Sequence, residues 1–217
     1  MDAGAARKGD VAALPQVEPA VDGPLERIDD RYGPGALLTP ANAITIARLV
    51  LSPALLVLIV QDPMSWAAAG FWVVLAGSDA IDGQLARRHG TTRSGAFLDP
   101  LADKVLVLGA LFALVAAERF WIVPVALIAL REVAISVYRT QLARQGLAVP
   151  ARRSGKVKTL VQELAVALAL FPPTGEHLAW ASGTLWIAVA ITWFSGAQYL
   201  IDGRSAATRL GHRTAAT

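Results

Sequence analysis

Four aspartates in the sequence are spaced so that they can act together. Asp79 and Asp82 are three residues apart, and Asp99 and Asp103 are four residues apart. On a helix, residues three or four positions apart lie on one face. The break between the two pairs, near Gly90, is short, so the two helices are expected to be antiparallel neighbours. All four carboxylates are then expected at one end of a helix pair.

Four ionised carboxylates in one place repel one another and need a counter-charge. A divalent cation supplies it, and a set of oxygen ligands without His or Cys suits Mg²⁺ or Mn²⁺. Two such ions would hold a diphosphate and stabilise charge on both the attacking and the leaving oxygen. In an alternative interpretation the acids are helix caps and surface charges at the membrane edge. This explains only Asp99, which directly precedes Pro100 and so fits a helix N-cap.

The elements that position these acids are long and apolar. Apolar residues make up 54% of the 217 residues and charged residues 17%, below the roughly 25% of an ordinary soluble domain. Six apolar stretches are close to the ~20 residues with which a helix crosses a bilayer. They cover residues 40–60, 66–87, 97–117, 120–142, 156–172 and 178–201. The composition excludes a soluble globular enzyme and predicts an all-α integral membrane protein with six transmembrane helices.

The charged residues predict the domain organisation and the topology. Residues 1–36 are rich in Ala, Pro, Gly and acids without an apolar period, which predicts a disordered cytosolic arm. Residues 37–202 form the predicted transmembrane domain, and residues 203–217 a basic cytosolic tail. Lys and Arg gather in the second and fourth connections and in the tail, which predicts both termini and the acids on the cytoplasmic side of the cell membrane. A net charge of +3 without a basic face predicts no nucleic-acid partner.

The acidic segment also resembles the signature of the CDP-alcohol phosphotransferases, integral membrane enzymes of phospholipid synthesis. The matching pattern is Asp79-x2-Asp82-Gly83-x2-Ala86-Arg87-x7-Gly95-x3-Asp99-x3-Asp103. The resemblance implies a six-helix bundle, commonly homodimeric, with a two-metal site for Mg²⁺ (or Mn²⁺) that opens to the cytoplasm. It further implies that the four aspartates hold the metals and that Asp103 is the catalytic base.

In the reaction that this resemblance implies, an alcohol attacks the β-phosphorus of a CDP-linked lipid and CMP leaves. Gly83 and Ala86 have little bulk, so the nucleotide is expected to lie against their helix, with Arg87 near phosphate charge. Gly95 and Thr45 complete the predicted CDP site. Small residues also allow close helix packing in membranes, and both roles are compatible.

Three further stretches resemble the branch that makes phosphatidylglycerol phosphate: residues 42–48, 131–139 and 155–162. That branch implies CDP-diacylglycerol as the donor and sn-glycerol 3-phosphate as the acceptor. A dianionic acceptor needs a basic pocket, for which the candidates are Arg131, Arg139, Lys156 and Lys158. A topological role remains open for the two lysines, and Arg131 is deep enough to need a partner such as Glu132.

Other functions remain open at this point. The same reaction with phosphatidylglycerol as the acceptor gives cardiolipin, and inositol phosphate is a further alternative acceptor. From a different class, a divalent-cation transporter also places acids inside the membrane, although usually near the midplane and with a repeated half. A membrane prenyltransferase uses acids and Mg²⁺ on a diphosphate, but typically needs more spans than this chain supplies.

Overall fold

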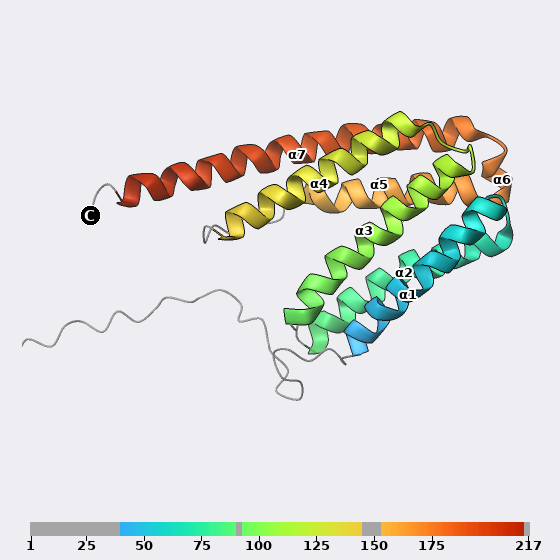
Figure 1. The fold of residues 1–217 in the computed structure, drawn as a ribbon, viewed down its shortest axis with the longest axis horizontal. Helices are drawn as coiled ribbons and strands as arrows, with labels where there is room; N and C mark the ends of the chain where they lie inside the picture. Colours follow the sequence, from blue (N-terminus) through green and yellow to red (C-terminus); the bar gives the residue numbers. More distant parts are fainter. Residues whose placement is uncertain (1–39, 90–92, 145–152, 215–217) are drawn as a thin grey trace, which may run out of the picture.

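The computed structural model describes residues 40–89, 93–144 and 153–214, with side chains for residues 42–78, 98–144 and 155–205. The regular elements in these ranges are all helices (Figure 1): α1 (Pro40–Gln61), α2 (Trp66–His89), α3 (Arg93–Ala116), α4 (Ile122–Arg144), α5 (Arg153–Leu170), α6 (Pro172–Gly175) and α7 (Leu178–Thr214). The predicted N-terminal arm, residues 1–36, lies outside the described residues.

Each of the six predicted stretches corresponds to one long helix, but the ends differ. Helix α3 begins at Arg93, so Pro100 lies inside it and the interpretation of Asp99 as an N-cap is wrong. Helix α7 continues to Thr214, beyond the predicted end at residue 201. The reason is the same in both cases: apolar residues mark where a helix lies in an apolar environment, and a helical backbone continues through polar residues outside it.

Two helices in the described part of the chain are long and apolar enough to cross a membrane, Asn42–Gln61 and Leu178–Ser205, and the apolar part of α2, Trp66–Ser78, is shorter. Helices α3 and α4 contain charged residues of the predicted site, which lowers their hydropathy. The outer faces of the bundle carry exposed apolar side chains such as Val57, Leu130 and Phe194. Such an exterior suits lipid, and helices satisfy their own backbone hydrogen bonds there.

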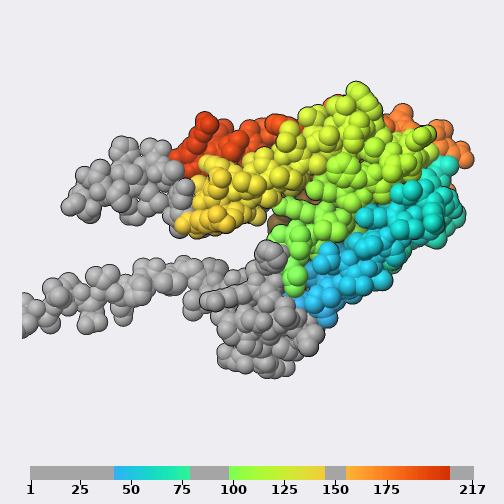
Figure 2. Space-filling view, viewed as in Figure 1, coloured from blue at the N-terminus to red at the C-terminus, as the bar shows by residue number. Residues whose placement is uncertain are grey.

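The long helices form two groups that diverge toward one end. Helices α1, α2 and α3 run together, as do α4, α5 and α7, and the two groups meet near α6 (Figure 1). The space-filling view shows a notch between α3 and α4 at the opposite end (Figure 2). Asp99, Arg139 and Lys156 belong to this diverging end, because α3 and α5 begin there and α4 ends there.

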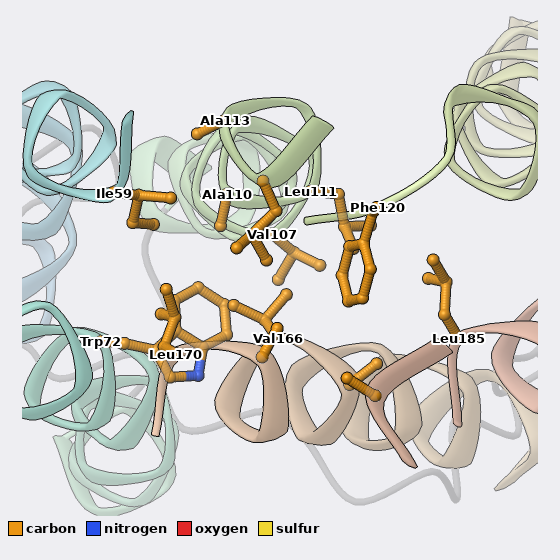
Figure 3. Packing of buried hydrophobic residues seen from close by; sticks show 14 of the residues in the cluster. Ile59, Trp72, Val107, Ala110, Leu111, Ala113, Phe120, Val166, Leu170 and Leu185 are labelled. Carbon is orange, nitrogen blue, oxygen red and sulfur yellow. The ribbon is translucent and has the colours of Figure 1, made fainter. Parts of the chain in front are cut away.

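The apolar core lies toward the α6 end of the bundle. Trp72 of α2, Leu111 of α3, Val166 of α5 and Leu185 of α7 are at most 2% exposed and meet in one cluster (Figure 3). Interdigitated side chains of this kind give helices a fixed relative position. The core therefore holds α2, α3, α5 and α7 together at one end, while at the other end the two groups of helices diverge.

At the α6 end, a hydrogen bond joins the connection between α3 and α4 to helix α6. Arg119, between α3 and α4, donates from its guanidinium to the carbonyl oxygen of Gly175. Burial lowers the pKa of Arg119 from its usual value, but an arginine remains charged at neutral pH. A Cβ at Gly175 would lie 3.0 Å from the sulfur of Met64 and 3.2 Å from the carbonyl oxygen of Ala169, so this close approach favours glycine.

Candidate active site

The acids of the predicted metal site lie on α2 and α3. Asp79 and Asp82 are within α2, but their side chains lie outside the described residues. Asp99 and Asp103 are one turn apart on α3, and both side chains are partly buried. Among the residues with described side chains no group of three metal-ligating residues is found. The four-acid cluster thus stays a prediction, of which the structure describes the half on α3.

Helix α1 presents a buried polar face to these two helices. Four residues along it, Asn42, Thr45, Arg48 and Ser52, are at most 2% exposed. The hydroxyl of Thr45 donates a hydrogen bond to Oδ1 of Asp99 at 2.7 Å. The Nε of Arg48 donates to the hydroxyl of Ser78 at 3.1 Å, directly before Asp79 in the sequence. Helix α1 therefore contacts both of the helices that carry the acids, and it orients the carboxylate of Asp99.

The predicted nucleotide residues are only partly described. The side chains of Ala86 and Arg87, and the surroundings of Gly83 and Gly95, lie outside the described residues, although all four positions belong to helices α2 and α3. Thr45 was predicted to contact CDP, and the structure shows its hydroxyl directed at Asp99. Thr45 therefore contacts the described half of the predicted metal site, and its contact with CDP stays a prediction.

A cavity of about 230 Å³ opens beside Asp103, between α3, α4, α5 and α7. Its charged lining residues are Asp103, Lys104, Arg131, Glu132, Arg139, Lys156 and Lys158. The structure therefore brings all four predicted acceptor-binding residues together with the predicted base, although they come from separate helices. Five basic and two acidic side chains give this cavity an excess of positive charge, which favours an anionic ligand.

Glu132 connects two of the basic residues. Its carboxylate accepts a hydrogen bond from Nη1 of Arg131 at 2.9 Å and another from the ammonium of Lys158. Arg131 and Glu132 are each 6% exposed, and buried charges of this kind persist only when they are paired. The expected partner of Arg131 is confirmed, and the same carboxylate also fixes Lys158 of α5 against α4.

Sequence reasoning missed several residues of the cavity. Lys104 donates to the hydroxyl of Ser136, which in turn donates to the backbone carbonyl of Glu132 at 2.6 Å. Ser195 and Tyr199 of α7 also line the cavity. Lys104 had a local signal, because it follows Asp103 directly. Ser195 and Tyr199 had no distinguishing signal, because α7 contains a second Ser-Gly pair, Ser182-Gly183, and other polar residues.

Comparison with known proteins decides the family. Residues 38–206 match the family model described as CDP-alcohol phosphatidyltransferase. The chain belongs to the CDP-alcohol phosphatidyltransferase family. The resemblance inferred from the aspartate pattern is therefore confirmed, and with it the prediction of an enzyme rather than a transporter. Membership also places the chain among membrane-bound transferases of phospholipid biosynthesis.

Curated relatives in this family resemble most of the chain. A "CDP-diacylglycerol--glycerol-3-phosphate 3-phosphatidyltransferase" of Sodalis glossinidius is 40% identical over 171 residues, covering 74% of this chain and 92% of its own. The protein of the same name from Escherichia coli K12 is 38% identical over 170 residues, covering 75% and 93%. A "Probable phosphatidylglycerophosphate synthase" of Mycobacterium tuberculosis H37Rv is 36% identical over 167 residues, covering 74% and 79%.

Proposed function

We propose that this enzyme transfers the phosphatidyl group of CDP-diacylglycerol to a hydroxyl of sn-glycerol 3-phosphate and releases CMP. The observation that carries the proposal is the cavity in which Asp103 lies beside Arg131, Arg139, Lys156 and Lys158. A small acceptor with a dianionic phosphate matches this excess of positive charge. The names of the relatives point to the same pair of substrates.

The chemistry needs a base and a fixed acceptor. Asp103 accepts the proton of the acceptor hydroxyl while the oxygen of that hydroxyl forms a bond to the β-phosphorus of the donor. The bond from that phosphorus to the oxygen bridging to the α-phosphate breaks, and CMP leaves with that oxygen. The basic side chains hold the acceptor phosphate, which lets the hydroxyl approach with little loss of entropy in the reaction step. Phosphoryl-type transfer depends mainly on such positioning and on charge neutralisation.

Metal ions complete the proposal. Asp79, Asp82, Asp99 and Asp103 would hold two Mg²⁺ (or Mn²⁺) ions. The two described members fit, because both are partly buried carboxylates and the hydroxyl of Thr45 orients Asp99. When bound, the ions neutralise the charge of the donor diphosphate. The CDP moiety is proposed to lie along Gly83, Ala86, Arg87 and Gly95, with Thr45 at its edge.

The position in the membrane is also part of the proposal. We infer that α1 to α5 and α7 each cross the bilayer within the transmembrane domain of residues 37–202. The diverging end and both termini then face the cytoplasm of the cell, where the soluble acceptor is available. The distribution of Lys and Arg supports this orientation. Residues 1–36 and 203–217 are proposed as cytosolic segments, and the protein as a homodimer, which the family resemblance supports.

An acceptor panel tests the proposed function. Purified protein with CDP-diacylglycerol and Mg²⁺ is assayed for CMP release with sn-glycerol 3-phosphate, phosphatidylglycerol, inositol phosphate or no acceptor. We expect release with sn-glycerol 3-phosphate only, and loss of that release when the metal is chelated. Release with phosphatidylglycerol or inositol phosphate alone would contradict the acceptor, and undiminished release without metal would contradict the metal site.

A further inference from the structure

Helix α7 contributes residues to the acceptor cavity that carry no charge and have no evident role in the reaction. We propose that Ser195, Gly196 and Tyr199 are positioning residues that fix two arginines of α4, Arg131 and Arg139, and thereby determine how tightly the acceptor phosphate is held. This inference rests on the proposed function, because it assigns the cavity to the acceptor. It adds an element, α7, that the charge pattern does not single out.

The first contact of α7 is with Arg131. The Nη2 of Arg131 donates to the hydroxyl of Ser195 at 3.0 Å, while its Nη1 donates to Glu132 at 2.9 Å. The guanidinium is thus held between two helices. Arg131 is 6% exposed, whereas Arg139 and Lys156 are exposed, so Arg131 lies at the deep end of the cavity. A small shift of this group therefore changes where a phosphate can bind.

Gly196 makes the position of Arg131 possible. A Cβ at Gly196 would lie 2.9 Å from the Nε of Arg131 and 3.5 Å from its Cγ. Such a contact is too short, so any larger residue must displace the arginine. Because Ser195 and Glu132 hold the guanidinium on either side, the displacement weakens those hydrogen bonds. On the same helix, Gly183 offers a contrast, since a Cβ there would meet nothing within 4 Å.

The second contact of α7 is made one turn further along that helix, by Tyr199, and its partner is Arg139, two turns beyond Arg131 on α4. The guanidinium carbon of Arg139 lies 5.6 Å from the centre of the Tyr199 ring, a cation–π contact. Tyr199 is itself held edge-on by Tyr138, with ring centres 6.2 Å apart. A further turn along, a Cβ at Gly203 would lie 2.6 Å from the hydroxyl oxygen of Tyr138, so glycine makes room for that ring. One face of α7 therefore contacts the α4 face that carries both arginines.

Substitution of Gly196 tests the proposal. Gly196→Ala and the control Gly183→Ala are compared in a CMP-release assay, with the acceptor and the donor varied in turn. We expect Gly196→Ala to raise the KM for sn-glycerol 3-phosphate by about tenfold, the effect of weakening one hydrogen bond to a charged group. The KM for CDP-diacylglycerol and kcat are expected to stay near those of the control. Equal KM values in the two variants, or a change confined to kcat, would overturn the proposal.

Ser195→Ala provides a second variant that leaves the backbone of α7 unchanged, and it decides the question if Gly196→Ala fails to fold. It removes one hydrogen bond to Arg131 and is expected to raise the same KM. An unchanged KM for the acceptor in Ser195→Ala would likewise overturn the proposal.

Binding of radiolabelled sn-glycerol 3-phosphate to the purified proteins, without the donor, separates this inference from the proposed function. If the unmodified protein binds this ligand and Gly196→Ala and Ser195→Ala bind it more weakly, the inference is supported even if CMP is not released. If the unmodified protein and these two variants bind it equally strongly, the inference is refuted even if CMP is released.

Discussion

The two ends of the helix bundle are built from the same helices but differ in the side chains that meet there. Toward α6, the helices meet over Trp72, Leu111 and Val166, which are almost wholly buried and apolar. At the opposite end, α3, α4, α5 and α7 surround a cavity lined by five basic and two acidic side chains. The apolar packing and the proposed chemistry therefore lie at different ends of the same helices. Packing at one end leaves room for a charged cavity at the other.

Helix α3 extends through both ends of the bundle. Its residues Leu106, Leu111 and Leu114 are at most 2% exposed in the core, while Asp99 and Asp103 lie nearer its beginning. A helix is a stiff connection over this length, so the packed end determines where the acids lie. Substitutions at the charged end are therefore expected to change the rate of CMP release or the KM values, with little effect on thermal stability. Substitutions in the core are expected to lower thermal stability, with little effect on the KM values.

The largest effect is expected at Asp103. Asp103→Asn removes the proposed base while it keeps the size of the side chain, and we expect CMP release to fall about a thousandfold. Binding of CDP by the variant, measured separately, is expected to remain detectable. Asp62→Asn, an exposed acid between α1 and α2, is the matched control and is expected to retain full activity. If Asp103→Asn also retained full activity, Asp103 would not be the base.

A smaller effect is expected at the mouth of the cavity. Lys156 is exposed and lines the cavity, so Lys156→Ala removes one positive charge near the acceptor phosphate. We expect the KM for sn-glycerol 3-phosphate to rise by about tenfold, with a smaller change in the KM for the lipid donor. Arg144→Ala, at the end of α4 and also exposed, serves as the control. Equal acceptor KM values in the two variants would show that Lys156 does not bind the acceptor and that its charge only affects the orientation in the membrane.

The smallest effect on turnover is expected in the core. Leu111 is fully buried, and Leu111→Ala is expected to destabilise the fold by about 2–5 kcal/mol through the cavity that it leaves. Thermal unfolding in detergent measures the loss, with Leu164→Ala on an exposed face of α5 as the control. At a temperature where the variant is folded, both KM values should be unchanged. A large rise in the acceptor KM would show that the two ends are not independent.

Most of the fold follows from the sequence because its signal is local. Six apolar stretches separated by turn residues predicted six long helices, and the structure has them within a few residues at most ends. The errors occurred where the helix continues through polar residues, as at Arg93 before Asp99 and at the end of α7. The turn of helix at Pro172–Gly175 was not predicted, since it falls at the interval between the stretches 156–172 and 178–201 and such a short element has little periodicity.

The site was predictable to the extent that its residues carry charge or a family pattern. Arg139, Lys156 and Lys158 were chosen because each is a basic residue near the cytoplasmic end of an apolar stretch, and Arg131 because it lies deeper in a stretch that resembles the same family branch. Ser195 and Tyr199 could not be found in this way, because their importance arises from packing of α7 against α4. Such contacts between helices distant in sequence leave no periodic signal in a single sequence.

The basic cavity beside Asp103 is proposed to receive the phosphate of the acceptor. A structure of the protein with bound sn-glycerol 3-phosphate and Mg²⁺ is the decisive experiment. We expect the phosphate among Arg131, Arg139, Lys156 and Lys158, with a hydroxyl of the ligand directed at the carboxylate of Asp103. A ligand bound elsewhere, with only water or lipid in the cavity, would refute the proposed acceptor site.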